Sequence, residues 1–266
     1  MTTVYPVYYE THGVKGAPAV ALSMGLGSDL TRWSPDFLAD LARDHFVVCI
    51  ENRDSGRSLQ PGDEVVPYDL RDMAADVLAV MDELEQLRFT TVGFSMGGMI
   101  AQLVAITAPH RVERMVQICS SGGESPPALC EGVHEQFERT VAPFDSREEM
   151  IDFLTESYRH FSHPNPLSRE ETRASVIERL DSGFSQRGYK RQYEAIRATP
   201  DRRVELQQIT APALVIGSEQ DNCLPVESSC SAAQLIPNAE LVLFANKGHA
   251  LDAEILETVA TWLRRG

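Results

Sequence analysis

Short apolar runs alternate with amphipathic segments over most of the chain. Runs of five or six residues with few polar interruptions lie at 19–24, 46–50, 89–94, 115–119, 213–217 and 240–244. Such runs are expected for strands that helices cover on both faces. Residues 68–84 place apolar side chains at i, i+3 and i+4 spacing, which predicts an amphipathic helix. This alternation predicts a mostly parallel, doubly wound α/β sheet with right-handed crossovers. The opening residues 4–13 predict an antiparallel edge ribbon.

The strand pattern stops after Cys119 and resumes only at residue 213. Between these points the sequence predicts short helices joined by loops. An all-helical block between two strands predicts an insertion on the sheet rather than a separate sequential domain. We expect it to form a cap over the carboxyl ends of the strands, where open α/β sheets bind ligands. The expected boundaries are 1–123 and 207–266 for the core and 124–206 for the helical cap.

The sequence Ser-Met-Gly occurs twice, and the two serines have different surroundings. Ser95 lies in "GFSMG", after an apolar strand and before a good helix, with Gly93 and Gly97 flanking it at two residues' distance. This is the context of a nucleophile elbow, in which a sharp turn exposes the serine hydroxyl. Ser23 lies in a strand that leads into a glycine-rich loop, with the next helix delayed to about Ser34. We expect Ser23 to be a buried hydroxyl bonded to nearby backbone.

A serine nucleophile needs a base and an orienting acid, which in this fold follow in the order serine, acid, histidine. His249 fits this order best, because it lies in a loop between the last strand and a terminal helix. Asp221 is the favoured acid, and Glu219 is its main competitor at the end of the same strand. The acid would fix the imidazole tautomer and stabilise the imidazolium that forms during attack. Asp252 is expected near the cap of the last helix.

Two loops beside these residues carry further candidates. Backbone N–H groups of Met96 and Leu26 are the expected donors of an oxyanion hole, since one follows the nucleophile and the other follows the first apolar strand. The segment 51–58, "ENRDSGRS", has the composition of a turn. Its Arg53 and Arg57 could reach a substrate carboxylate, but we favour ion pairs that brace the loop.

Composition and charge limit the classes of partner. The chain has 266 residues and a formal net charge of −15, which disfavours nucleic acids and anionic membranes as partners. The first residues lack a signal-peptide pattern and no apolar run is long enough to span a membrane, so we expect a cytoplasmic protein. The five cysteines contain no CxxC pair. We therefore expect free thiols, no metal site and no cofactor. The sequence leaves open whether the chain forms a homo-oligomer.

Taken together, these motifs resemble the α/β-hydrolase superfamily over nearly the whole chain. The segments most similar to aclacinomycin methylesterase-like hydrolases are "MGLGSDLTRW", "ENRDSGRS", "VGFSMGG", "RQYEAIRATPDRRVELQQITAPALVIGSEQD" and "IPNAELVLFANKGHAL". The resemblance implies Ser95, Asp221 and His249 as a catalytic triad. The chain departs from the family where it has Met24-Gly25, since many members have His-Gly there. The oxyanion donors are backbone groups, so this change should alter the pocket wall rather than remove the oxyanion hole.

The function that these residues predict is hydrolysis of a small-molecule carboxylic ester, such as a small acyl or methyl ester, through an acyl-enzyme. Serine at position 95 argues against haloalkane dehalogenase and epoxide hydrolase chemistry, which need a carboxylate nucleophile in this fold. A lactonase, a perhydrolase or a carbon–carbon bond hydrolase would use the same triad. A receptor that keeps the fold and only binds its ligand is a further alternative.

Overall fold

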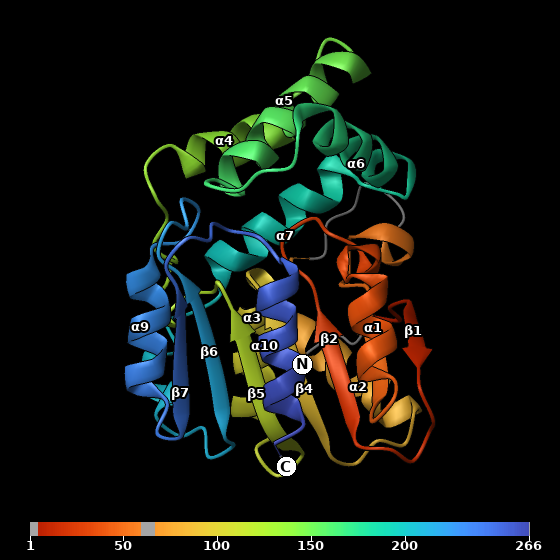
Figure 1. Ribbon diagram of the computed structural model, residues 1–266, viewed down its shortest axis with the longest axis vertical. Helices are drawn as coiled ribbons and strands as arrows, with labels where there is room; N and C mark the ends of the chain where they lie inside the picture. Colours follow the sequence, from red (N-terminus) through yellow and green to blue (C-terminus); the bar gives the residue numbers. More distant parts are fainter. Residues whose placement is uncertain (1–4, 60–66, 266) are drawn as a thin grey trace.

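The structure, a computed structural model, describes residues 5–59 and 67–265 and contains one seven-stranded sheet (Figure 1). Its strands follow the order β1-β3-β2-β4-β5-β6-β7. They are β1 (Tyr9–His12), β2 (Ala19–Ser23), β3 (Phe46–Ile50), β4 (Phe89–Phe94), β5 (Val112–Ile118), β6 (Ala213–Ser218) and β7 (Ala239–Phe244). β1 is an edge strand that pairs antiparallel with β3, and the other pairs are parallel. The predicted doubly wound sheet with an antiparallel edge is therefore confirmed for the described residues, of which residue 4 is not one.

Helices cover both faces of this sheet. The helices of the sheet layers are α1 (Pro35–Leu41), α2 (Leu70–Glu83), α3 (Met96–Thr107), α9 (Val226–Leu235) and α10 (Ala253–Leu263). Alternate residues of β3 point to opposite faces: Val47 and Cys49 join a core cluster with α1 and α10, whereas Phe46, Val48 and Ile50 join one with α2 and α3. The strands inside the sheet, such as β2, β3 and β6, are buried on both sides, which explains their continuous apolar sequence, whereas the edge strands β1 and β7 are partly exposed.

The amphipathic pattern at 68–84 forms α2, close to the predicted bounds. Asp69 begins the helix with a capping box, in which its side chain accepts from the helix backbone and the Asp72 side chain accepts from the Asp69 N–H. The buried stripe consists of Leu70, Met73, Ala74, Asp76, Val77, Val80 and Met81. Asp76 is the charged residue of this stripe, and the spacing of the apolar residues does not predict that it is buried.

The segment between β5 and β6 is helical throughout its described elements. It forms α4 (Val133–Val141), α5 (Arg147–Phe161), α6 (Arg169–Asp181), α7 (Gln186–Ala198) and α8 (Arg203–Leu206). Figure 1 shows α4 to α7 gathered beyond the end of the sheet at which the parallel strands finish. Ile151, Leu154 and Val176 form a small core between α5 and α6. The division into a core and a cap at residues 124 and 206 remains a prediction.

The arginines of the segment 51–58 form ion pairs, as expected. Buried Arg53 contacts buried Asp76 of α2 at 2.5 Å, and Arg57 contacts Glu51 at 2.9 Å. The Arg53–Asp76 pair therefore connects the loop after β3 to α2.

No described helix is both long and apolar enough to cross a membrane. All five cysteines are free thiols.

Removal of the buried carboxylate of this pair tests its contribution to the fold. We expect Asp76→Ala to lower the free energy of unfolding by about 3–5 kcal/mol, because it leaves the buried Arg53 guanidinium without that carboxylate. Asp82→Ala on the same helix is the control: Asp82 pairs with Arg111 at an exposed site, where ion pairs contribute about 0–1 kcal/mol. Urea denaturation measures both. Equal losses in the two variants would contradict the account.

Candidate active site

Ser95 lies at the sharp turn between β4 and α3. Its backbone has φ 55° and ψ −119°, a region that is costly for a residue with a side chain. A Cβ added to Gly93 would lie 1.9 Å from the carbonyl oxygen of Gly97, and one added to Gly97 would lie 2.1 Å from that of Ser23. Both glycines are therefore required by close backbone approach at the turn.

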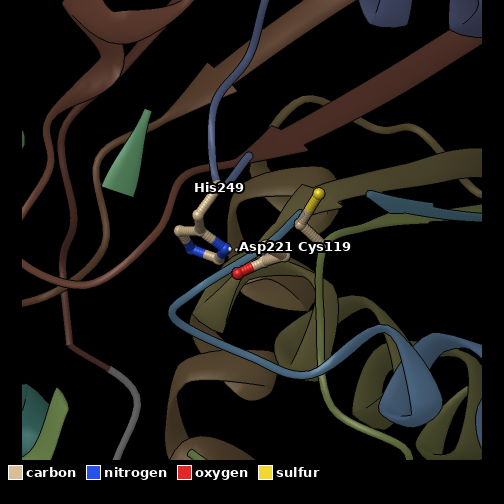
Figure 2. Close-up of side chains that lie close together, drawn as sticks. All are labelled: Cys119, Asp221 and His249. Atoms are coloured by element: carbon tan, nitrogen blue, oxygen red, sulfur yellow. Dashed lines mark hydrogen bonds and ion pairs between the residues drawn. The ribbon is translucent and has the colours of Figure 1, made fainter. Parts of the chain in front are cut away.

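The structure brings the three predicted residues together from three different loops. The Ser95 Oγ lies 3.0 Å from His249 Nε2, and His249 Nδ1 lies 2.7 Å from Asp221 Oδ2. Figure 2 shows the imidazole and the carboxylate facing each other across this second contact. A carboxylate only accepts hydrogen bonds, so Nδ1 carries the proton in neutral His249 and Nε2 is free to accept one from Ser95. The competing acid, Glu219, is exposed and takes no part.

Asp221 is held so that one oxygen faces His249. Its Oδ1 accepts from the backbone N–H groups of Cys223 and Leu224 at 2.8 and 2.9 Å, which leaves Oδ2 for the imidazole. Burial opposes protonation of the imidazole, but the Asp221 carboxylate outweighs burial and raises the pKa of His249 well above its ordinary value. The arrangement therefore favours uptake of a proton by His249.

Cys119 lies beside this pair, at the end of β5 (Figure 2). Among the described residues, Cys119, Asp221 and His249 are the group whose ligand atoms lie close enough together for a metal ion, within 4.8 Å of one another. Burial raises the pKa of the Cys119 thiol to about 12, so it is protonated at neutral pH. The carboxylate and the imidazole already bond each other. A metal would have to break that bond and deprotonate the thiol, so the cluster fits a hydrogen-bonded pair better than a metal site.

The two expected oxyanion donors lie next to the serine. Met96 is the first residue of α3, so its N–H has no acceptor within the helix. Within the described chain, neither its N–H nor that of Leu26 donates to a protein acceptor. The loop of Leu26 passes close to the nucleophile, since a Cβ added to Gly25 would lie 3.2 Å from the Ser95 Cβ. Both N–H groups are thus available at this end of the sheet.

Side chains on both sides hold the Leu26 peptide in place. Asn52 Nδ2 donates to the Met24 carbonyl at 2.8 Å, and fully buried Gln192 of α7 accepts from the Gly27 N–H at 2.7 Å. Gln192 also donates to the Arg53 carbonyl at 2.7 Å. Sequence reasoning missed both Asn52 and Gln192. An isolated polar residue in an apolar helix stripe is the signal that could have indicated Gln192.

The helical segment also anchors the histidine. The His249 N–H donates to the Phe161 carbonyl at the end of α5 at 2.8 Å. A Cβ added to Gly248 would lie 2.0 Å from the carbonyl oxygen of His163, so only glycine allows this approach. The imidazole packs against the rings of Phe94 and Phe161, with centroids 4.9 and 6.4 Å away. The loop of His249 is therefore fixed by contacts far from it in sequence.

Ser23 is buried, as expected, but one part of its interpretation is wrong. Its hydroxyl has no hydrogen-bond partner among the described residues, whereas a bond to nearby backbone was expected. The Ser23 carbonyl, rather than the hydroxyl, makes the contact that shapes the site, because it packs against Gly97.

Asp252 begins α10 and accepts from the N–H groups of Glu254 and Ile255, which confirms its predicted capping role.

A cavity of about 410 Å³ opens above Ser95 and His249. Apolar and aromatic side chains from the helical segment line much of it, including Phe137, Leu154 and Tyr158. A second, apolar cavity of about 30 Å³ shares Leu26, Ser95, Phe137 and Cys223 with the first and extends toward Met99 and Ile196. Ser95 therefore lines both a large compartment and a small one.

The family model of the alpha/beta hydrolase fold matches residues 18–251, nearly the whole chain. The chain belongs to the α/β-hydrolase fold family. This confirms the predicted superfamily and fold class. The solved enol-lactonase from Burkholderia xenovorans LB400 has 26% sequence identity and a TM-score of 0.79, over 97% of this chain and 94% of that one. The chain is accordingly a hydrolase-type enzyme.

Curated relatives of this hydrolase include several chemistries. The rhodomycin D methylesterase DnrP of Streptomyces peucetius is 28% identical over 92% of this chain and 90% of its own length. The 3-oxoadipate enol-lactonase 2 of Acinetobacter baylyi is 31% identical over 80% of this chain and 75% of its own length. A protein of Pseudomonas savastanoi pv. phaseolicola named as a carbamate hydrolase, RutD, is 29% identical over 92% of each chain. Their names share hydrolysis at a carbonyl group but no single substrate.

The Gln192 contact generates a prediction about catalysis. We expect Gln192→Leu to lower kcat about tenfold or more with little change in KM, because the Leu26 N–H loses its fixed position, whereas Gln192 is not among the residues that line the cavity. Gln192→Glu keeps the acceptor for the Gly27 N–H and should retain more activity. Steady-state kinetics with p-nitrophenyl acetate measure the effect.

The matched control is Gln186→Leu at the start of α7. Gln186 bonds the carbonyls of Thr140 and Ala142 and does not touch the Leu26 loop. An equal loss of kcat in Gln186→Leu would mean that both variants act by loosening α7, and the positioning role would be wrong.

Proposed function

We propose that the enzyme is a serine hydrolase of small-molecule carboxylic esters that works through an acyl-enzyme, with Ser95 as nucleophile, His249 as base and Asp221 as orienting acid. The observation that carries the proposal is the continuous chain of contacts from Ser95 Oγ through the imidazole to the Asp221 carboxylate. The backbone N–H groups of Leu26 and Met96, which have no acceptor among the described residues, lie next to the same serine. A cytoplasmic location is part of this proposal.

In the first half-reaction, the Ser95 oxygen bonds the ester carbonyl carbon while His249 Nε2 takes the hydroxyl proton. The negative charge that develops on the carbonyl oxygen is stabilised by the N–H groups of Leu26 and Met96, each worth about 3–4 kcal/mol in comparable sites. The bond to the alcohol oxygen then breaks, and that oxygen receives the proton from the imidazolium. Water repeats the sequence on the acyl-enzyme and releases the acid.

The raised pKa of His249 suits this role, since Asp221 stabilises the imidazolium that forms in each step. The two unequal compartments that Ser95 lines support an ester with one small and one large group. The methylesterase among the relatives supports the same division.

A lactonase is the second candidate. The enol-lactonases among the relatives favour it, and ring opening of a cyclic ester would use the same three residues. A panel of p-nitrophenyl esters, methyl esters, lactones and carbamates separates these candidates by their relative kcat/KM. A perhydrolase, a carbon–carbon bond hydrolase and a receptor that only binds stay alternatives, and the two experiments below discriminate the receptor from any enzyme.

The nucleophile is tested by Ser95→Ala. We expect kcat for p-nitrophenyl acetate to fall by about 10⁵-fold or more, because no other group can form the acyl-enzyme. Ser23→Ala is the matched control, since it alters the other copy of the Ser-Met-Gly sequence at a buried hydroxyl that has no partner among the described residues. It should keep wild-type kcat. Wild-type turnover by Ser95→Ala would overturn the proposal.

The pH dependence of kcat/KM tests the base. Below its pKa His249 is protonated and cannot accept the Ser95 proton, so activity should be lost as pH falls through that pKa. Since the Asp221 carboxylate raises the pKa, we expect the midpoint above the ordinary histidine value of 6.5. Exposed Glu219→Gln should leave the midpoint unchanged, whereas Asp221→Asn should lower kcat by about 10⁴-fold. A kcat/KM for an uncharged ester that does not change between about pH 5 and pH 8 would contradict the assignment of His249 as the base, because this range spans the ordinary histidine pKa.

A further inference from the structure

Arg32 brings a positive charge to the wall of the larger cavity. It ends the 3₁₀ turn Leu30–Arg32, which follows the loop of the proposed oxyanion donor Leu26, and it lines the cavity together with Ser28 and Ser175. Its Nη1 donates to the Ser175 hydroxyl at 2.8 Å. In the described part of the chain it forms no ion pair with a carboxylate, unlike neighbouring arginines of α5 and α6 such as Arg147 and Arg173.

Burial lowers the pKa of Arg32, and the nearby carboxylates of Asp29 and Glu178 oppose this, but neither forms an ion pair with Arg32 in the described part of the chain. Asp29 accepts from the Thr31 N–H at 2.9 Å and from the Thr31 hydroxyl with one oxygen. Its other oxygen accepts from the Ser182 hydroxyl at 2.7 Å. The Asp29 carboxylate therefore holds the turn to α6, and the Arg32 guanidinium keeps donor groups for another acceptor.

A second guanidinium lies close to the first. Arg179 of α6 is buried, donates to the Gly27 carbonyl, and has an Nε without a partner among the described residues. It also packs over the ring of Tyr158, a residue that lines the cavity. Burial, and then repulsion from Arg32, lowers the pKa of Arg179 to about 10, so both groups are charged at neutral pH. In the described part of the chain neither of these adjacent cations forms an ion pair with a carboxylate, although the formal net charge is −15.

We propose that the natural substrate carries a carboxylate that pairs with Arg32, while its ester carbonyl lies at Ser95. The inference rests on the proposed ester hydrolysis and narrows its substrate class to esters with an additional anionic group. A planar guanidinium beside serine hydroxyls matches a carboxylate, which it can bind through two parallel hydrogen bonds. The buried guanidinium of Arg179, next to Arg32, adds to the positive potential at this part of the cavity. The aromatic surface between the two ends accommodates the apolar part of such an ester.

The test compares esters that differ only in this charge. p-Nitrophenyl monoesters of the dicarboxylic acids from glutarate to suberate each have a neutral partner, the p-nitrophenyl ester of the monocarboxylic acid of equal chain length. 4-Acetoxybenzoate and 4-acetoxybenzamide form the corresponding pair with the charge on the alcohol side. kcat/KM is measured for each pair with the wild type, Arg32→Met, Arg32→Lys and Arg43→Met. Arg43 is an exposed arginine after α1, so its variant changes net charge equally without touching the cavity.

We expect the wild type to prefer the anionic member of at least one pair. Arg32→Met should lower kcat/KM for that ester about tenfold or more, mainly through KM, and leave its neutral partner unchanged. Arg32→Lys should retain part of the preference, and Arg43→Met all of it. No preference for any anionic ester, or equal losses for both members of a pair, would overturn the inference while leaving ester hydrolysis intact.

A binding measurement keeps the two proposals separable. Calorimetry with the Ser95→Ala variant compares each dicarboxylate with the monocarboxylate of equal length. Tighter binding of a dicarboxylate that Arg32→Met in the same background abolishes would support the anion site even if no ester were turned over. Equal binding of the two acids in both variants would overturn it.

Discussion

The close approach of β2 and the start of α3 is the constraint on which the site depends. Ser23 and Gly93 are paired across β2 and β4, and Gly97 has no side chain to keep α3 away from the Ser23 carbonyl. This contact places the end of β2 against the turn at Ser95 that follows β4. As a result, the Leu26 loop and the Ser95 hydroxyl reach the same point from adjacent strands. The two Ser-Met-Gly sequences therefore contribute to one site through different atoms.

The helical segment between β5 and β6 completes the site as well as covering it. The Phe161 carbonyl fixes the backbone of His249, and Gln192 fixes the peptide after Leu26. The geometry of the proposed base and of one proposed donor therefore depends on helices that contribute no reacting atom. Changes in α5 or α7 can alter catalysis as well as the shape of the cavity.

The sequence was sufficient for the sheet, the elbow and the three residues of the proposed triad. Each of these depends on local patterns: apolar runs make strands, two glycines permit the tight turn at Ser95, and Asp221 and His249 follow strand ends. Gln192 and Asn52 were missed because their partners lie 165 and 28 residues away, so only tertiary structure pairs them. For the same reason, the expectation that the Ser23 hydroxyl would bond to nearby backbone was wrong: only the packed structure shows which buried groups meet. The sequence also could not show that Arg32 has no carboxylate ion pair among the described residues, because this depends on the Asp29 carboxylate accepting from Thr31 and Ser182 instead.

The proposed function depends on a covalent intermediate at Ser95, for which the most direct test is mass spectrometry of the protein treated with a fluorophosphonate. We expect one stoichiometric adduct, located on the peptide that contains Ser95, with labelling abolished in His249→Ala, which lacks the base. An unlabelled wild-type protein, or an adduct located on another residue while Ser95 stays unmodified, would contradict it.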